Sequence, residues 1–276
     1  MKIKDKVRSA ILSRITDKVN QKIGIELETI IHTNNYKRLP ADEEGTFSSV
    51  DLLRLLNDKQ DNNGSYSLEP GGQLEWASPP FVDLNDLQSS LEFFCNQLDS
   101  LLNSKKLTLI NYALDPKFSP DEVSLINEKK YQIMDKHMSQ SGSMGRWMMR
   151  NTASIQINLD TTDPKNMEVI AFVSDCINPI ASYLFANSPY KQLTPTGFQN
   201  VRQLIWHDTD QLRCGNLFDH QIYSSNGLID KYIDYVMKVP NMFKINRSGN
   251  YVRSQSIIGD RLTTVSYTHL RAHETQ

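Results

Sequence analysis

Three short segments of this chain alternate strictly between apolar and polar side chains. They are "IGIELE" at residues 23–28, "QLEW" at residues 73–76 and "SIQINLD" at residues 154–160. Successive side chains of a β-strand point to opposite faces, so each segment presents one apolar face and one polar face. The pattern predicts a mostly antiparallel sheet, covered by helices on its apolar side and open on its polar side.

Helical periodicity fills the sequence between these segments. The clearest helix is predicted from Leu84 to Leu101, where apolar residues recur every three or four positions and Asp83 can cap the first turn. Four more are predicted: residues 5–20, the capping box at 119–122 through Met134, Asp163 to residue 186 with a kink or break at Pro179, and residues 227–239. Helices and strands do not alternate regularly, which favours the α+β class over a doubly wound fold.

Composition narrows the classes of function. The formal net charge is −2, so there is no overall positive field to attract nucleic acid or an anionic membrane. The basic amino end has no apolar core of a secretory signal, and the most apolar window, residues 167–186, is interrupted by Asp175 and Pro179. The three cysteines are far apart and form no C-x-x-C pair, which argues against zinc or a disulfide framework. We therefore expect a soluble, cytoplasmic protein.

Acids and amides dominate the polar faces of the predicted strands. Glu26 and Glu28 share one face about 7 Å apart, since each strand residue rises about 3.3 Å, and such carboxylates repel unless a cation lies between them. Glu69 and Glu75 flank "PGGQ", a turn whose two glycines allow a close approach to the backbone. Oxygen ligands of this kind suit Mg²⁺ with a nucleotide better than zinc. No G-x-x-x-x-G-K-[ST] loop is present, so a P-loop phosphate site is excluded.

A cationic and aromatic group follows in "NVRQLIWHDTDQLRCG" at residues 200–215. If this segment is helical, Arg202 and Trp206 share a face because they are four residues apart. An arginine beside an aromatic ring can hold a carboxylate through two parallel hydrogen bonds. A buried arginine–aspartate network that serves only the structure is an equally good interpretation of this segment.

The chain resembles the plant- and proteobacterial-type glutamate–cysteine ligases. The resemblance runs from Ile23 to about Gly259 and rests on motifs that occur in the family's order, among them "IGIELE", "SLEPGGQLEWAS", "KYQIMDKHM", "MGRWMMRNTASIQINLD", "FANSPY", "GFQNVRQLIWHDTDQLRCG" and "YIDYVMKVP". It implies a glutamine-synthetase-like domain that joins L-glutamate to L-cysteine with ATP as co-substrate and Mg²⁺ as cofactor, in the first step of glutathione synthesis.

The resemblance also implies roles for individual residues. The expected metal and catalytic ligands are Glu26, Glu28, Glu69 and Glu75. Arg202, with Trp206 beside it, is expected to grip the amino-acid carboxylate, while Gln156 and Asn158 line the same wall. Many members carry an arginine where this chain has Asn151 after Arg150.

The carboxyl end departs from the family pattern. Residues 1–264 are expected to form part of a ligase catalytic domain, with residues 1–22 as a helix leading in, and the end "VSYTHLRAHETQ" at 265–276 looks non-native, as in a truncated reading frame. Two alternatives stay open: a related carboxylate–amine ligase with another acceptor, for example in ergothioneine synthesis, and a non-catalytic ligand-binding domain of the same fold.

Overall fold

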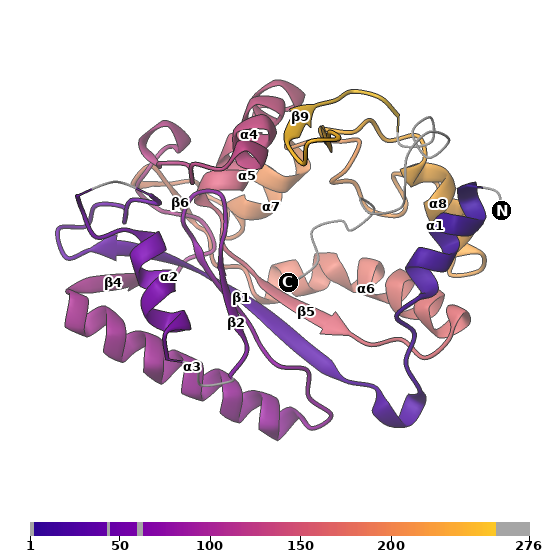
Figure 1. The fold of residues 1–276 in the computed structure, drawn as a ribbon, viewed down its shortest axis with the longest axis horizontal. Coiled ribbons are helices and arrows are strands. Elements are labelled where there is room, and N and C mark those ends of the chain that lie inside the picture. The colour runs from indigo at the N-terminus through magenta and orange to yellow at the C-terminus, as the bar shows by residue number, and fades with distance from the viewer. Residues whose placement is uncertain (1–2, 43–44, 60–62, 258–276) are drawn as a thin grey trace.

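One long strand organises the sheet. The structure, a computed structural model, describes residues 3–42, 45–59 and 63–257; the segment 265–276 therefore lies outside the described residues. Strand β1 (Ile23–Thr33) pairs with β3 (Leu74–Ala77) and β5 (Ile155–Leu159) along its first part and with β4 (Leu107–Ile110) along its second, and β2 (Ser65–Leu68) pairs with β3. Every pairing is antiparallel, and the order is β2-β3-β1-β4 with β5 also on β1 (Figure 1). All three alternating segments are thus strands of one antiparallel sheet, as predicted.

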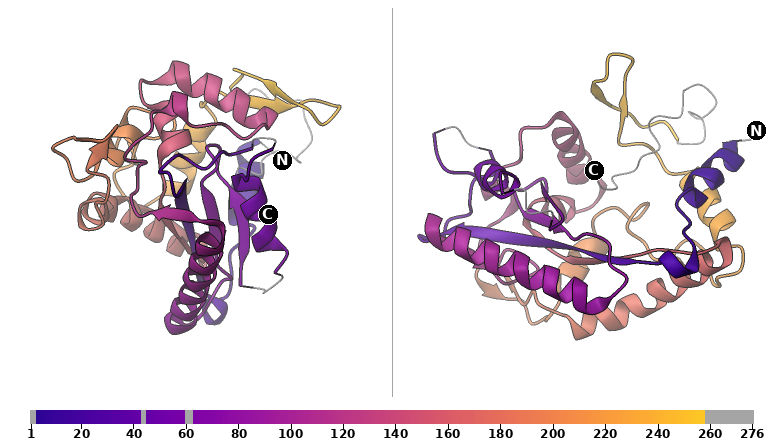
Figure 2. Two further views of the ribbon diagram at one scale, coloured as in Figure 1. Left: turned by 90° about the vertical axis from the view of Figure 1, so that its left-hand side faces the viewer. Right: turned by 60° about the horizontal axis from the view of Figure 1, so that its bottom comes forward.

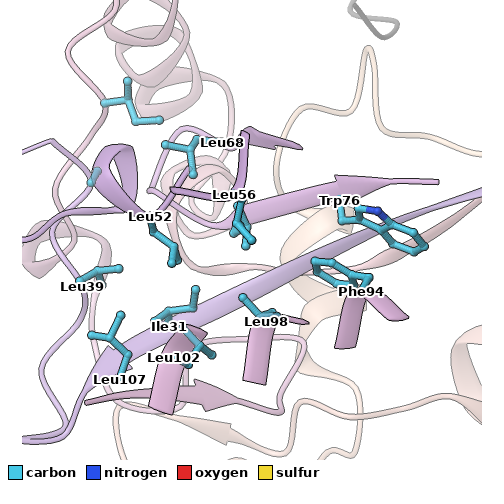
Figure 3. Packing of buried hydrophobic residues seen from close by; sticks show 13 residues of the cluster. Ile31, Leu39, Leu52, Leu56, Leu68, Trp76, Phe94, Leu98, Leu102 and Leu107 are labelled. Atoms are coloured by element: carbon cyan, nitrogen blue, oxygen red, sulfur yellow. The ribbon is translucent and has the colours of Figure 1, made fainter. Parts of the chain in front are cut away.

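The apolar face of this sheet packs against two helices, α2 (Ser49–Asn57) and α3 (Leu84–Lys105). Trp76 of β3 stacks on Phe94 of α3 with ring centroids 4.7 Å apart, and both side chains are fully buried (Figure 3). The side chain of Asp83 accepts a hydrogen bond from the backbone N–H of Asn85, which confirms the predicted cap of α3. In Figure 1, α3 lies on one side of β1. Helices α4 (Lys129–Ser141), α5 (Gly145–Asn151) and α7 (Val201–His207) lie on the other side of β1 in this view. Polar residues of the sheet such as Gln156 and Asn158 are exposed.

The remaining elements complete an α+β arrangement. Helix α1 (Ile3–Leu12) packs through Val7 against α8, which ends at Val236, before Pro240 as predicted. Figure 2 shows α1 next to α8 (Leu228–Val236) at the amino-terminal end of the molecule, as Figure 1 does. The other elements are η1 (Lys18–Asn20), η2 (Pro120–Glu122), α4 (Lys129–Ser141), α5 (Gly145–Asn151), α6 (Pro164–Leu184), α7 (Val201–His207), α8 (Leu228–Val236), and the hairpins β6 (Tyr190–Lys191) with β7 (Thr194–Pro195) and β8 (Phe243–Ile245) with β9 (Tyr251–Arg253).

Two predicted helices are shorter than their sequence pattern. Helix α1 ends at Leu12 rather than near residue 20, because the chain then turns and the backbone N–H of Thr16 bonds to the carbonyl of Thr161. The capping box at 119–122 does close, but it opens only one 3₁₀ turn. Val123 and Ile126 are buried there, and the backbone N–H of Ile126 donates a hydrogen bond to the carbonyl of Pro70. Helix α4 therefore starts only at Lys129. Tertiary contacts override local helical preference at both places.

Of the kink or break expected at Pro179, the break is absent, because α6 runs through this residue. Pro179 cannot donate to the carbonyl of Asp175, but Asp175 is only partly buried, so water can reach that carbonyl. No residue of α6 is buried. Its exposed apolar residues recur along one stripe, Val169, Val173, Ile177, Ile180 and Leu184, and β5 exposes Ile155, Ile157 and Leu159. Among the residues described, no helix is long and apolar enough to cross a membrane.

The Trp76–Phe94 stack yields a stability prediction. Replacing a buried phenylalanine by alanine typically costs about 3–5 kcal/mol because burial is lost and a cavity remains. We expect Phe94→Ala to lower the free energy of unfolding by that amount. Its sequence neighbour Phe93 is 48% exposed on the same helix, so Phe93→Ala is the matched control and should cost less than about 1 kcal/mol. Denaturant titration of both variants measures the difference, and equal losses would contradict this account of the core.

Candidate metal and substrate site

Strand pairing places two of the predicted acids face to face. In the register of β1 and β3, Glu28 lies directly opposite Glu75, and Glu26 lies opposite Ala77. Like charges directly opposite each other destabilise a sheet. The arrangement therefore needs compensation from the surroundings of these carboxylates.

A tight glycine turn brings in the third acid. Glu69 follows β2 and leads through Pro70, Gly71 and Gly72 into β3. Gly72 adopts φ +77°, and a Cβ atom on Gly71 would lie only 2.4 Å from the carbonyl oxygen of Arg150. A side chain at either position is excluded by strain or by collision, which is the physical reason for the two glycines.

Three of the four predicted glutamates converge. The carboxylate oxygens of Glu28, Glu69 and Glu75 lie within 4.8 Å of one another, and all three side chains are partly buried. Glu26 stands next to this group without joining it. Its Oε1 accepts a hydrogen bond of 2.9 Å from Nδ2 of Asn158, although its charge still acts on Glu75. The structure thus divides the predicted ligand set into three converging acids and one neighbour.

Polar side chains of β5, and Ser154 just before it, donate hydrogen bonds to these acids. Ser154 Oγ donates to Glu28 at 3.1 Å, and Gln156 Nε2 donates to the same carboxylate at 3.4 Å. Gln156 and Asn158 therefore line the wall as expected and act as donors to carboxylates. Ser67 of β2, which the sequence analysis did not select, donates to Glu75 at 2.7 Å.

Burial and mutual repulsion make these carboxylates bind protons tightly. Burial raises the pKa of Glu28 to about 7, although the Ser154 hydrogen bond and the charge of Arg202 oppose the change. Burial, followed by the charges of Glu28 and Glu75, raises the pKa of Glu69 to about 8. The pKa of Glu75 is also raised, mainly by burial. A group of acids that resists ionisation in this way is stabilised as carboxylates by a bound cation.

Arg202 faces this acidic group from α7. The helix starts at Asn200, whose side chain accepts from the N–H of Gln203, so Arg202 and Trp206 do share a helix face. The guanidinium lies 5.7 Å from the Trp206 ring centroid, and its charge lowers the pKa of Glu28. Arg202 Nε and Trp206 Nε1 are buried without a hydrogen-bond partner among the residues described here. Two buried donors without acceptors beside an acidic group are typical of a site that receives a polar ligand.

Lys130 is the functional candidate that sequence reasoning did not select. It lies at the start of α4, its charge lowers the pKa of Glu69, and its Nζ lies 4.4 Å from the Tyr131 ring centroid. The motif "KYQIMDKHM" was the available signal, but a lysine in a predicted helix is usually a solvated residue. The acidic group therefore has a cation on each of two neighbouring helices.

Other charged residues of the quoted motifs serve the structure. Arg213 forms an ion pair with Asp210 and donates to the carbonyl of Pro240. The segment 200–215 therefore contains a structural arginine–aspartate pair in addition to Arg202, the candidate for ligand binding. Arg150 bonds to Asp135 at 2.8 Å and to the carbonyls of Pro120 and Val123 at 3.0 Å. These contacts hold Arg150 in a structural role.

The donor set fits a hard divalent cation. Three carboxylates within 4.8 Å provide oxygen ligands, which Mg²⁺ prefers, and no histidine or cysteine joins them in the part of the chain that the structure describes. The flanking cations are suited to anionic groups of a substrate, because arginine binds carboxylates and phosphates through paired hydrogen bonds. The site can therefore hold a metal ion and an anionic ligand next to each other.

Comparison with known proteins agrees with this chemistry. The chain is 27% identical over 238 residues to glutamate–cysteine ligase A, chloroplastic, of Oryza sativa subsp. indica, which covers 84% of this chain and 48% of the relative. It is 32% identical over 201 residues to the chloroplastic glutamate–cysteine ligase of Brassica juncea, covering 73% of this chain and 38% of the relative. The chain thus spans half or less of the length of these curated relatives. The model of glutamate-cysteine ligase family 2 (GCS2) matches residues 22–274, and the chain belongs to this family.

Proposed function

We propose that this chain forms the acid-lined part of the active site of an ATP-dependent ligase that joins the γ-carboxylate of L-glutamate to the amine of L-cysteine. The observation that carries the proposal is the convergence of Glu28, Glu69 and Glu75 between Arg202 and Lys130. An antiparallel sheet with one acidic face also supports a glutamine-synthetase-like domain. The names of the family and of the relatives supply glutamate and cysteine as the substrates.

The proposed reaction has two steps. An oxygen of the glutamate γ-carboxylate attacks the terminal phosphorus of ATP, and ADP leaves with the electrons of the broken P–O bond. The amine of cysteine then attacks the carbonyl carbon of the γ-glutamyl phosphate, loses a proton, and phosphate leaves with the electrons of the C–O bond. Activation by phosphate is needed because a free carboxylate is a poor acceptor for an amine.

The residues of this chain would divide the work. Glu28, Glu69 and Glu75 would hold Mg²⁺, which neutralises phosphate charge in such transfers. Arg202 would grip the glutamate carboxylate with its unpartnered Nε edge, backed by Trp206. Gln156 and Asn158 would keep Glu28 and Glu26 oriented through the hydrogen bonds described above.

The decisive experiment is an acceptor panel. A chain extended to the length of the curated relatives is incubated with ATP, Mg²⁺, glutamate and a series of amines, and phosphate release is measured. We expect release to require glutamate and to be fastest with cysteine. Preference for another amine would indicate a related carboxylate–amine ligase. Nucleotide binding without any phosphate release would indicate a non-catalytic domain.

The metal role predicts a specific loss on substitution. Glu75→Gln keeps the size of the side chain but removes one charge from the cation site, so Mn²⁺ used as a spectroscopic substitute for Mg²⁺ should bind at least about tenfold more weakly. Turnover of the extended chain should fall by orders of magnitude, because a metal contributes several kcal/mol of charge stabilisation. Glu92→Gln on the outer surface of α3 is the control. Wild-type affinity in Glu75→Gln would remove Glu75 from the ligand set.

The raised pKa values of Glu28 and Glu69 predict an unusual pH dependence of stability. Both groups hold protons more tightly in the folded chain than in the unfolded chain, where the pKa is 4.5. Their contribution to the free energy of unfolding is therefore fully present below about pH 4.5 and is lost as pH rises through about 7 to 8. In EDTA the wild type should lose stability between about pH 6 and pH 8.5. The double variant Glu28→Gln with Glu69→Gln should lose less, because the glutamines do not ionise.

Mg²⁺ should reverse this loss. A cation stabilises the folded chain by binding the ionised carboxylates, and it competes better with protons at high pH. Thermal unfolding in EDTA and in excess Mg²⁺ at both pH values measures the effect. The Mg²⁺-induced rise in Tm should be larger near pH 8.5 than near pH 6. An equal rise at both pH values would argue against cation binding by these carboxylates.

A further inference from the structure

We propose that Arg38 is a positioning residue for the acidic site: it fixes the glycine turn that carries Glu69 and Glu75 against β1 without contacting metal or substrate. This inference rests on the metal role proposed above. Arg38 follows β1 in the chain and is 8% exposed. None of the motifs that identified the site includes it.

The guanidinium of Arg38 connects separate parts of the structure. Its Nη1 donates to Asp115 Oδ2 at 2.9 Å, and its Nη2 donates to the carbonyl of Gly71 at 3.2 Å. The same Nη2 reaches the carbonyl of Arg150 at 3.5 Å. A planar guanidinium can hold acceptors in such fixed directions, which the ammonium of lysine cannot do.

Asp115 anchors this arrangement to β1. Its side chain is fully buried, and its Oδ2 also contacts Nε2 of His32 at 2.9 Å, while its Oδ1 accepts the backbone N–H groups of Lys117 and Phe118. His32 lies on β1 four residues after Glu28 and on the same face, because side chains alternate along a strand. A continuous path of hydrogen bonds thus runs from β1 through His32, Asp115 and Arg38 to Gly71.

The Gly71 carbonyl is a sensitive point for the site. Within the turn, the N–H of Gly72 bonds to the carbonyl of Glu69 at 2.8 Å, and the N–H of Glu69 bonds to the carbonyl of Gln73 at 2.9 Å. A rotation of the Gly71 peptide therefore moves Glu69 relative to Glu28. Repulsion between the carboxylates favours movement of the turn away from β1. The hydrogen bond from Arg38 to the Gly71 carbonyl opposes this movement.

Arg38 reaches the third side of the site through Arg150. The segment that follows Arg150 leads to Ser154, whose Oγ donates to Glu28 at 3.1 Å. The charge of Arg38 is already paired with Asp115, so its effect on the acids comes through the backbone it holds. One buried side chain thus contacts or connects all three segments that carry the acids and their donors.

The experiment separates positioning from simple stabilisation. Replacing both partners of a buried ion pair by neutral residues of similar volume is often neutral for stability, whereas removing one partner leaves an unpaired buried charge. The double variant Arg38→Met with Asp115→Asn should therefore fold with a Tm near that of the wild type. It cannot grip the Gly71 carbonyl, so we expect its Mn²⁺ affinity to fall about 10–100-fold, as for supporting groups of other metal sites.

The chain offers a closely matched control. Arg213 pairs with the buried Asp210 and donates to the carbonyl of Pro240, which is the same chemistry in a segment that carries none of the acids. Arg213→Met with Asp210→Asn should leave Mn²⁺ affinity within about twofold of the wild type. Arg38→Lys provides a third variant. Lysine keeps the positive charge but lacks the planar guanidinium that donates to Asp115 and Gly71 at the same time, so this variant should also weaken Mn²⁺ binding.

Each outcome decides one point. Mn²⁺ affinity is measured by electron paramagnetic resonance on the 276-residue chain, well below the Tm of each variant. If the Arg38 variants bind Mn²⁺ like the wild type while Glu69→Gln does not, the positioning role is wrong and the metal site stands. If the wild type and Glu69→Gln bind Mn²⁺ equally, the proposed metal role fails, and the positioning role fails with it. Should the first double variant not fold, Arg38→Lys decides by the same affinity measurement.

Discussion

The structure depends on a repulsion: Glu28 and Glu75 face each other across paired strands, with Glu69 brought to the same place by a turn. A sheet gains nothing from such an arrangement. Its surroundings compensate in several ways, through amide and hydroxyl donors on β5 and β2, through cationic side chains on α4 and α7, and through proton uptake. A bound cation would relieve the remaining energetic cost, and the proposed chemistry depends on such a cation.

Much of the fold could be predicted from local patterns. β1, β3 and β5 are visible in the sequence because apolar residues alternate with acids and amides along each of them. The apolar face packs on helices in β1 and β3, whereas the apolar residues of β5 are exposed, so the expected helical cover does not extend over β5. Helices α3 and α6 begin where Asp83 and Asp163 cap them, as their sequences indicate. Strands β2 and β4 are as short as β3, but the sequence does not single them out. β2 carries serines in place of the acids and amides that mark β3, and β4 follows the long helix α3 after a single residue. The helix predicted from residue 119 ends early because burial of Val123 and Ile126 is a tertiary effect.

The site was predictable where motifs carry it and hidden elsewhere. Strand faces and family motifs point to the four glutamates and Arg202; the structure brings three of the acids together and places Arg202 where its charge lowers the pKa of Glu28. Glu26 accepts a hydrogen bond from Asn158 and does not join the three converging acids. This difference depends on side-chain geometry, which the alternation of residue types along a strand does not reveal. Lys130 and Arg38 look like ordinary surface cations in the sequence. Glu69, on which the charge of Lys130 acts, lies far from it along the chain, as do Asp115 and Gly71, to which Arg38 donates.

The register of β1 restricts how such a chain can change over time. Glutamates and apolar residues alternate over residues 25–28 of β1, so inserting or deleting a single residue there would exchange the two faces. Acids would then point toward Trp76 and Phe94, while Ile25 and Leu27 would replace them in the site. Single substitutions on either face harm only one contact. Insertions and deletions should therefore be tolerated better in the connecting loops than along this strand.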